Sequence, residues 1–88
     1  MNNIFAFTLS CKQNFFDEGE CVFMDDGSIA GKILHKAKID IDCEDNYYSY
    51  DIESTEEEYN ALLDGTKKIY KLSDYHISPC NTYYTSNL

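Results

Sequence analysis

The chain contains no arginine and only seven lysines, so positive charge is scarce. Sixteen aspartate and glutamate residues outnumber those lysines and give the 88 residues a net charge of −9. A surface of that sign repels nucleic acid and attracts basic proteins or cations. We therefore expect no direct binding to DNA or RNA.

Long hydrophobic runs are also missing. No segment reaches the roughly 20 apolar residues that cross a membrane, and we expect no membrane contact. The apolar run 4–11 has no basic region before it and no clear cleavage site after it, which is typical of a strand and not of a signal peptide. Four cysteines could pair in three ways in a secreted protein. Without an export signal we expect a cytoplasmic protein with reduced, mostly buried thiols.

Motifs that carry catalysis are absent from the sequence as well. There is no GxSxG and no phosphate-binding loop, and no local motif places a nucleophile beside either histidine. Paired carboxylates on an exposed hairpin would lack the cleft that separates their pKa values. We expect a protein that is not an enzyme and that needs no cofactor.

What the sequence does contain is enough apolar residues for a folded domain. Hydrophobic residues make up 43% of the chain and aromatic residues 15%, more than a disordered acidic chain carries. We expect one domain over residues 1–78, whose core supplies roughly 3–5 kcal/mol of net stability. The polar residues 79–88 indicate a tail that is loosely docked.

Periodicity predicts an α+β fold: a small, mainly antiparallel sheet of two hairpins plus edge strands, with one short helix packed on one face. Alternating apolar residues indicate strands over 4–11 and 29–43, the longer one bending near Gly31 or His35. The Asp-Asp-Gly sequence at 25–27 indicates a hairpin turn of type I′ between the strand at 21–24 and the long strand.

The helix is predicted from its ends. Ser54 or Thr55 can cap its first turn, because glutamates follow three residues later, and acidic residues suit that end of the helix dipole. Gly65 favours the left-handed conformation that ends a helix. A further strand is expected over 66–72.

The second hairpin has an expected register. A two-residue turn at 45–46 places Ile39 opposite Ile52 and puts the odd residues of the long strand on the apolar face. Asp40 then lies opposite Asp51 on the other face. Directly opposed like charges destabilise a sheet, so this arrangement would cost the free protein stability.

Carboxylates concentrate in this hairpin and are continued by the first turn of the helix. In the expected register they form a row with a spacing of roughly 6.6–6.8 Å along one strand. Such a row can imitate the phosphates of a nucleic-acid strand and dock on a basic surface, with a tyrosine as aromatic anchor. The residues expected to contact the partner are Asp40, Asp42, Glu44, Asp45, Tyr47, Asp51, Glu53, Glu56 and Glu57.

A solvated face that serves only solubility is the simpler explanation for these acids. The distribution of charge argues against it, since Lys32, Lys36 and Lys38 precede the acids on the same expected strand face. Charge that served only solubility would be interspersed. The change from basic to acidic along one face therefore favours a binding role.

In size, charge sign and compact α+β layout the chain is similar to phage-encoded anti-CRISPR and anti-restriction proteins and to the immunity proteins of nuclease toxins. The resemblance rests on no shared motif and transfers no residue assignments. It implies a small inhibitor whose partner is a nucleic-acid-processing enzyme with a basic surface. The alternative is an accessory interaction module with incidental acidity, which makes contact through the Phe15-Phe16 loop or the aromatic tail.

Two metal sites fit parts of the sequence, and neither is expected to form. A D-x-D-x-E-x-N pattern over 40–46 matches the ligand spacing of an EF-hand, but Asp45 stands where that loop needs glycine. His76 and Cys80 have a spacing suited to two zinc ligands, but no CxxC pair accompanies them. Oligomeric state stays open between a monomer and a homodimer paired through an exposed edge strand.

Overall fold

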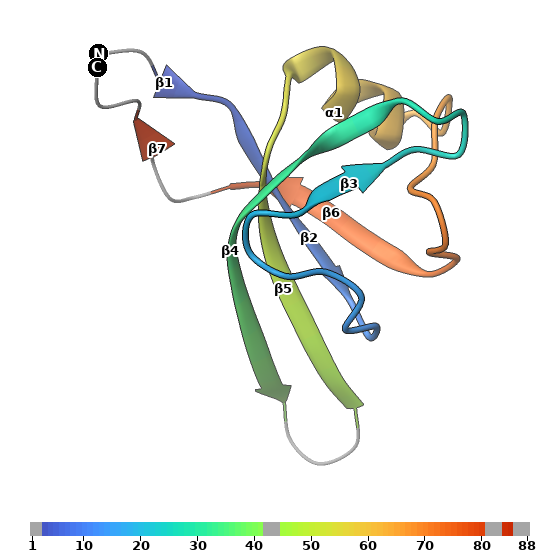
Figure 1. The fold of residues 1–88 in the computed structure, drawn as a ribbon. Coiled ribbons are helices and arrows are strands. Elements are labelled where there is room, and N and C mark those ends of the chain that lie inside the picture. The colour runs from blue at the N-terminus through green and yellow to red at the C-terminus, as the bar shows by residue number, and fades with distance from the viewer. Residues whose placement is uncertain (1–2, 42–44, 81–83, 86–88) are drawn as a thin grey trace.

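The computed structural model describes residues 3–41, 45–80 and 84–85, with side chains described over 4–39 and 47–80 (Figure 1). A five-stranded sheet has the order β3-β4-β5-β2-β6, every neighbouring pair antiparallel, while β1 and β7 form a separate pair. The predicted α+β class is confirmed. The elements are β1 (Asn3–Ile4), β2 (Ala6–Cys11), β3 (Cys21–Phe23), β4 (Ile29–Ile41), β5 (Asp45–Glu53), α1 (Glu56–Leu63), β6 (Tyr75–Pro79) and β7 (Tyr84–Thr85).

The core lies on one face of the sheet, under α1 and the loops that flank it. Tyr59 of α1 places its ring centroid 5.4 Å from that of Phe7 in β2, which confirms that the helix packs on the apolar face. Alternation along β2 and β5 supplies the floor, as expected for half-buried strands. The buried residues are Phe7, Leu9, Cys11, Val22, Met24, Ala30, Ile33, Tyr50, Ile52, Leu62, Ile69 and Leu72.

The predicted helix ends are confirmed. Thr55 is the N-cap, and its hydroxyl oxygen accepts a hydrogen bond from the Glu58 backbone N–H at 3.2 Å. Gly65 follows the helix with φ of +82°. Just before the helix, the Ser54 hydroxyl donates to the Ala30 carbonyl oxygen at 2.5 Å and so joins the helix entry to β4. No helix in the described part of the chain is long and apolar enough to cross a membrane.

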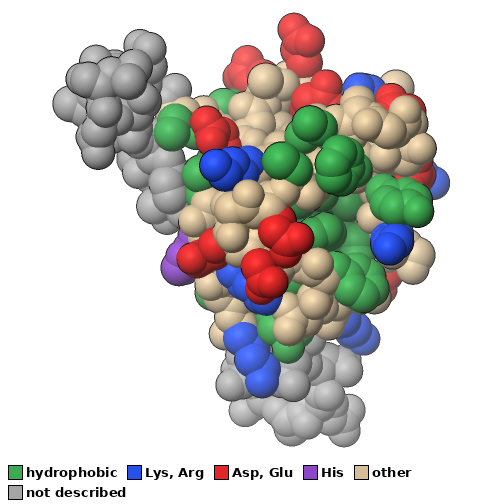
Figure 2. Space-filling model, viewed as in Figure 1, with side chains coloured by type: hydrophobic (Ala, Val, Ile, Leu, Met, Phe, Trp, Pro, Cys, Tyr) green, Lys and Arg blue, Asp and Glu red, His purple; other side chains and the backbone are tan. Residues whose placement is uncertain are grey.

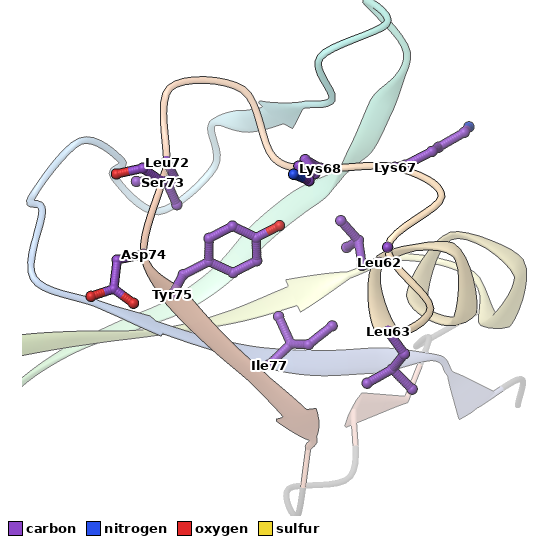
Figure 3. Close-up of a pocket in the computed structure, with 10 residues that line it drawn as sticks. Leu62, Leu63, Lys67, Lys68, Leu72, Ser73, Asp74, Tyr75 and Ile77 are labelled. Atoms are coloured by element: carbon purple, nitrogen blue, oxygen red, sulfur yellow. The ribbon is translucent and has the colours of Figure 1, made fainter.

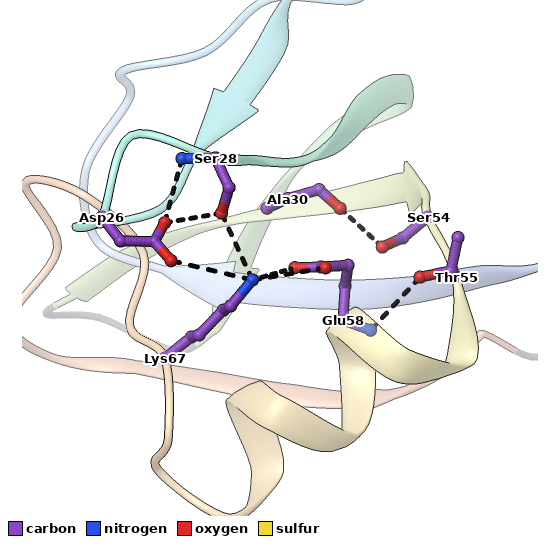
Figure 4. A network of polar contacts seen from close by, with 7 residues as sticks. All are labelled: Asp26, Ser28, Ala30, Ser54, Thr55, Glu58 and Lys67. Atoms are coloured by element: carbon purple, nitrogen blue, oxygen red, sulfur yellow. Dashed lines mark hydrogen bonds and ion pairs between the residues drawn. The ribbon is translucent and has the colours of Figure 1, made fainter.

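Lys67 fastens the segment after α1 to the turn between β3 and β4 (Figure 4). Its Nζ lies 3.3 Å from Glu58 Oε2, 3.4 Å from Ser28 Oγ and 3.7 Å from Asp26 Oδ2. Hydrogen bonds from the Ser28 side chain and backbone, with the nearby Lys67 charge, lower the pKa of the Asp26 carboxyl. One lysine therefore links three segments of the fold.

Two predicted elements differ in the structure. The hairpin at Asp25-Asp26-Gly27 forms, but only Gly27 has positive φ, so it is a three-residue loop and not a type I′ turn. The strand expected over 66–72 is absent, since Ile69 makes only an isolated bridge to Met24 and Lys71 has φ of +72°. The strand that completes the sheet is β6, and the expected domain boundary falls at its last residue, Pro79.

The predicted register of the second hairpin is wrong. Ile33 lies opposite Ile52, and β4 then carries an irregularity between Ile33 and His35, at one of the two expected bend positions. Beyond that bulge Ile39 pairs with Tyr47 and Ile41 with Asp45, and residues 42–44 between the two strands lie outside the described residues. A bulge adds one residue to one strand, so it exchanges the two faces of the strand beyond it.

This exchange of faces separates lysines that we expected on one face. Lys32 pairs with Glu53 on the outer face, whereas Lys36 pairs with the fully buried Tyr50 on the core face. Ile39, expected in the core, is 37% exposed. The predicted change from basic to acidic charge along one face of β4 therefore does not occur as expected.

Candidate binding surfaces

The β4–β5 hairpin extends beyond the rest of the sheet, on the side away from α1 (Figure 1). β2 pairs with β5 over 48–53, and β3 pairs with β4 over 29–32. Within the described residues, positions 39–41 and 45–47 therefore pair only with each other. We call residues 39–47 the ribbon. It is a two-stranded projection, and no third strand among the described residues pairs with it.

Four of the predicted contact residues belong to the end of the ribbon. The backbone of Asp40 pairs with Asn46, and that of Asp45 pairs with Ile41. Asp42 and Glu44 lie outside the described residues, as do the side chains of residues 40–46. Four carboxylate residues thus fall within six sequence positions, and the structure places Asp40 and Asp45 in the ribbon.

Tyr47 is the last residue of the ribbon, next to the part of β5 that pairs with β2. Its side chain is half-buried, and the Lys12 Nζ lies 5.8 Å from the centroid of its ring. An ammonium at that distance is attracted by the negative face of the ring. The tyrosine expected as a binding anchor is therefore already in contact with the chain's own lysine.

Asp51 and Glu53 lie farther along β5, on the outer face of the sheet. The Asp51 carboxylate accepts a hydrogen bond from the Thr8 hydroxyl at 2.9 Å, and Asp51 pairs with His35. Glu53 pairs with Lys32. Asp51 therefore does not lie opposite Asp40, and the predicted double row of carboxylates is wrong.

Glu56 and Glu57 are exposed in the first turn of α1, at the other end of β5 (Figure 1). The eight residue steps from Asp45 to Glu53 span roughly 26 Å of extended strand. The helix glutamates therefore do not continue the acidic end of the ribbon. The seven predicted contact residues that the structure describes fall into three separate places.

Lys36 fastens the loop between β2 and β3 to the base of the ribbon. Its Nζ lies 3.2 Å from Asp17 Oδ1 and donates a hydrogen bond to Asn14 Oδ1. The ammonium also lies 5.6 Å and 5.9 Å from the ring centroids of Tyr48 and Tyr50. The side chain is only 20% exposed. The alternation of the long strand predicts Lys36 on the solvent face, so the sequence alone does not indicate this role.

Tyr50 joins the same loop to the core. Its hydroxyl donates to the Gln13 carbonyl oxygen at 2.9 Å, and the Phe16 ring meets its ring edge-on at a centroid distance of 5.3 Å. Burial raises the pKa of Tyr50 to about 12, because the charged form would lose its hydration. The loop and the ribbon base thus share one packed junction.

A second candidate surface is aromatic. Phe15, Phe23 and Tyr70 are 53%, 47% and 54% exposed and surround a hollow of about 430 Å³. The Lys71 ammonium lies 5.6 Å from the Tyr70 ring centroid. Figure 2 shows hydrophobic side chains gathered on this face of the molecule. We call Phe15, Phe16, Phe23 and Tyr70 the aromatic patch. The Phe15-Phe16 pair was noted from the sequence, but only the fold brings the other two beside it.

A third feature is an open hollow of about 580 Å³ over the core face of β6 (Figure 3). Leu62 and Leu63 come from the end of α1, and Tyr75 and Ile77 from β6. The Tyr75 hydroxyl accepts a hydrogen bond from the Ile69 backbone N–H at 3.3 Å. Lys67, Lys68, Ser73 and Asp74 share the lining with these apolar residues. Leu63 is 54% exposed.

Metal ligands do not converge in the described part of the chain. No group of three or more His, Cys, Asp or Glu side chains there is placed to hold an ion. His76 is exposed on β6 and Cys80 follows that strand. Most of the EF-hand-like pattern lies at 40–46, where side chains are outside the described residues.

Comparison of the chain with protein-family models, with curated proteins and with solved structures finds no match. The functional proposal therefore rests on the fold, the surfaces and their charge.

Proposed function

We propose that this chain is a small, non-enzymatic inhibitor that docks the acidic end of its ribbon on the basic groove of a nucleic-acid-processing enzyme. The observation that supports it is the placement of Asp40 and Asp45 toward the end of a projecting hairpin, with Asp42 and Glu44 between them in the sequence. A two-stranded projection can enter a groove that a compact surface cannot. The net charge of −9 steers it toward basic partners.

The base of the ribbon supports the same role. Binding costs less conformational entropy when the hairpin is already ordered. The contacts of Lys36 with Asp17 and with the Tyr50 ring order the base of this hairpin. Asp51 and Glu53 lie on the outer sheet face beside the ribbon and would meet the rim of the groove. Inhibitors of anti-CRISPR, anti-restriction or immunity type, including those of phages, work on partners of this class.

A cytoplasmic site of action is part of the proposal. Cys11 is buried, and its thiol donates a hydrogen bond to the Gln13 carbonyl oxygen at 3.4 Å. Burial raises the pKa of this thiol, which keeps it neutral and slow to oxidise. A core that holds a neutral thiol suits a reducing compartment.

The test uses two variants with the same change in charge. Asp40→Lys with Asp42→Lys acts at the ribbon, and Glu56→Lys with Glu57→Lys acts at the far end of the molecule. Both are compared with wild type as inhibitors of purified restriction, RNA-guided and toxin nucleases. We expect the ribbon variant to lose about tenfold or more in affinity and the helix variant to stay within about threefold.

Salt and DNA provide further readouts. Binding of the wild-type chain should weaken steeply with added salt, and duplex DNA should compete for the same groove. Equal losses in both variants would show that total charge, and not the ribbon, controls binding. No loss in the ribbon variant would overturn the proposal.

The aromatic patch supports a second candidate function, that of an accessory interaction module. Exposed phenylalanines and a tyrosine around one hollow are typical of contact surfaces between proteins. Phe15→Ser with Phe23→Ser would remove binding by this module, and added salt would leave its binding unchanged. The ribbon proposal predicts the reverse for both measurements.

A further inference from the structure

β6 is an outer strand of the sheet, and one of its sides is open. It pairs with β2 from Phe7↔Pro79 to Cys11↔Tyr75. In the part of the chain that the structure describes, no other backbone hydrogen bond involves residues 75–79. A row of unpaired backbone groups of this kind can pair with another strand.

Pro79 shows which backbone groups face the open side. Proline has no N–H, so the pair Phe7↔Pro79 cannot be the kind that exchanges hydrogen bonds. Hydrogen-bonded and non-hydrogen-bonded pairs alternate along two antiparallel strands. The backbone groups of His76 and Ser78 therefore form the hydrogen bonds to β2. The N–H and C=O groups of Tyr75 and Ile77, and the C=O of Pro79, therefore point away from the sheet.

The opposite edge of the sheet is protected. β3 has only three residues, and its register with β4 shifts between Val22 and Phe23. The Tyr70 backbone N–H donates to the Phe23 carbonyl oxygen at 2.9 Å. The segment around Tyr70 thus covers the outer side of β3. Short length, a bulge and a covering segment are the usual protections of an edge. β6 has five residues and an even register along β2.

Charge is compatible with pairing at β6. Its sequence, YHISP, contains no lysine, aspartate or glutamate. Two copies of a chain with a net charge of −9 repel each other, so they can approach most closely where carboxylates are missing. The other outer strand, β3, is also free of acids, but its outer side is covered. At the open edge of β6 a second copy would therefore meet no carboxylate on the strand that it pairs with.

We propose that two copies of this chain pair through β6 to form a homodimer with a continuous ten-stranded sheet. An antiparallel pairing about a two-fold axis at Ile77 uses all five residues of each strand. The Ile77 N–H of each copy donates to the Ile77 carbonyl oxygen of the other copy. The Tyr75 N–H of each copy donates to the Pro79 carbonyl oxygen of the other copy. Pro79 accepts a hydrogen bond there and needs no donor.

Apolar side chains support this pairing. Ile77 and Tyr75 share the core face, beside the hollow in Figure 3, so the two Ile77 side chains meet at the axis. α1 of both copies lies on that face, and the half-exposed Leu63 lies at the rim of the hollow. Backbone bonds combined with an apolar floor are the usual basis of strand addition.

The test measures the molecular mass of the full chain by sedimentation across a concentration series. Ile77→Pro removes the central N–H without removing a bond to β2, and Ile77→Val keeps that N–H. We expect Ile77→Pro to weaken dimerisation about tenfold or more, from two lost hydrogen bonds, and Ile77→Val to change it little. A monomer at every concentration, or a dimer that is unchanged in a folded Ile77→Pro variant, would overturn the proposal.

Hydrogen exchange of wild-type amides tests the same contact if Ile77→Pro fails to fold. The amides of Tyr75 and Ile77 should become protected as concentration rises, while those of His76 and Ser78 stay protected throughout. Free exchange of the Ile77 amide in the dimer would overturn the pairing. Added salt should strengthen this dimer and weaken binding to a basic enzyme, so the two proposals fail independently.

Discussion

The two ends of β5 belong to one strand but have different surroundings. Residues 48–53 lie between β2 and β4, and Tyr50 and Ile52 there are completely buried. Residues 45–47 pair with β4 alone among the described residues. Alternation by itself therefore does not bury a strand, because burial needs a third strand and a covering layer. The uncovered end is where the chain tolerates dense charge.

The largest expected effect comes from placing a charge at the covered end. Ile52→Asp puts a carboxylate in the core without a partner and should destabilise the fold by more than about 4 kcal/mol, comparable to the whole stability of a chain this size. Circular dichroism during thermal melting would show an unfolded chain. Ser49→Asp adds the same charge on the outer face and should leave a cooperative melt. A folded Ile52→Asp variant would contradict the assignment of faces.

Gly31→Ala tests how closely β4 and β5 approach at the covered end. An added Cβ would overlap the Glu53 carbonyl oxygen and lie 2.5 Å from Ile52 Cγ2. We expect a loss of about 3 kcal/mol in the free energy of unfolding, measured with urea. Gly19→Ala is the control. Its Cβ meets nothing within 4 Å, and its φ of +89° alone should cost about 1 kcal/mol. Equal losses would contradict the close approach.

Lys36→Met should weaken the contact between the β2–β3 loop and the base of the ribbon, which lies between the two ends of β5. The variant keeps most of the packing but loses the contacts with Asn14, Asp17 and the two tyrosine rings. We expect a loss of about 1–2 kcal/mol in urea unfolding, and faster hydrogen exchange in the ribbon. Lys38→Met changes an exposed lysine two residues along and should stay within about 0.5 kcal/mol. No difference between the variants would contradict the fastening role.

Tyr50→Phe gives a smaller loss that depends on pH. Removing the hydroxyl leaves the Gln13 carbonyl without its donor and should cost about 1 kcal/mol at neutral pH. The folded-state pKa of about 12 exceeds the ordinary value of 10.0, so the unfolded chain loses this proton first as pH rises. The stability that Tyr50 contributes is complete below pH 10 and is lost between pH 10 and about 12. The difference between wild type and variant in urea melts should therefore shrink over that range.

The smallest expected effect is at the projecting end. Asp40→Lys with Asp42→Lys should change the free energy of unfolding by less than about 0.5 kcal/mol, because the ribbon has no third strand to disturb. Thermal melting of this variant beside Ile52→Asp makes the comparison directly. A large loss of stability in the ribbon variant would show that its acids support the fold.

Much of the fold could be predicted from local patterns. The alternation in 4–11, the cap at Thr55 and the glycine at 65 each depend on a few neighbouring residues. The structure confirms these features. The buried face of β5 was also predicted correctly, since Tyr50 and Ile52 are both in the core.

The candidate site was harder to predict, because it depends on register. A bulge near Leu34 exchanges the faces of β4, and the contacts beside it join Lys36 to Asn14 and Asp17, about twenty positions away in sequence. Alternation cannot reveal such a bulge, since both sides of it keep a period of two. The expected pairing of Asp40 with Asp51 was lost for another reason, since Ile41 pairs with Asp45 and the two strands therefore connect earlier in the chain than the predicted turn.

By itself the sequence determined the class of fold, the charge of −9, the helix with its caps and the concentration of acids in one hairpin. The tertiary structure decided which acids share an end of the molecule, that β6 and not 66–72 forms the outer strand, and that Phe15 and Phe23 share a patch with Tyr70. The physical reason is the separation along the chain of the residues that interact. Caps, turns and alternation are set by neighbours in the chain, whereas bulges, edges and patches are set by packing between distant segments.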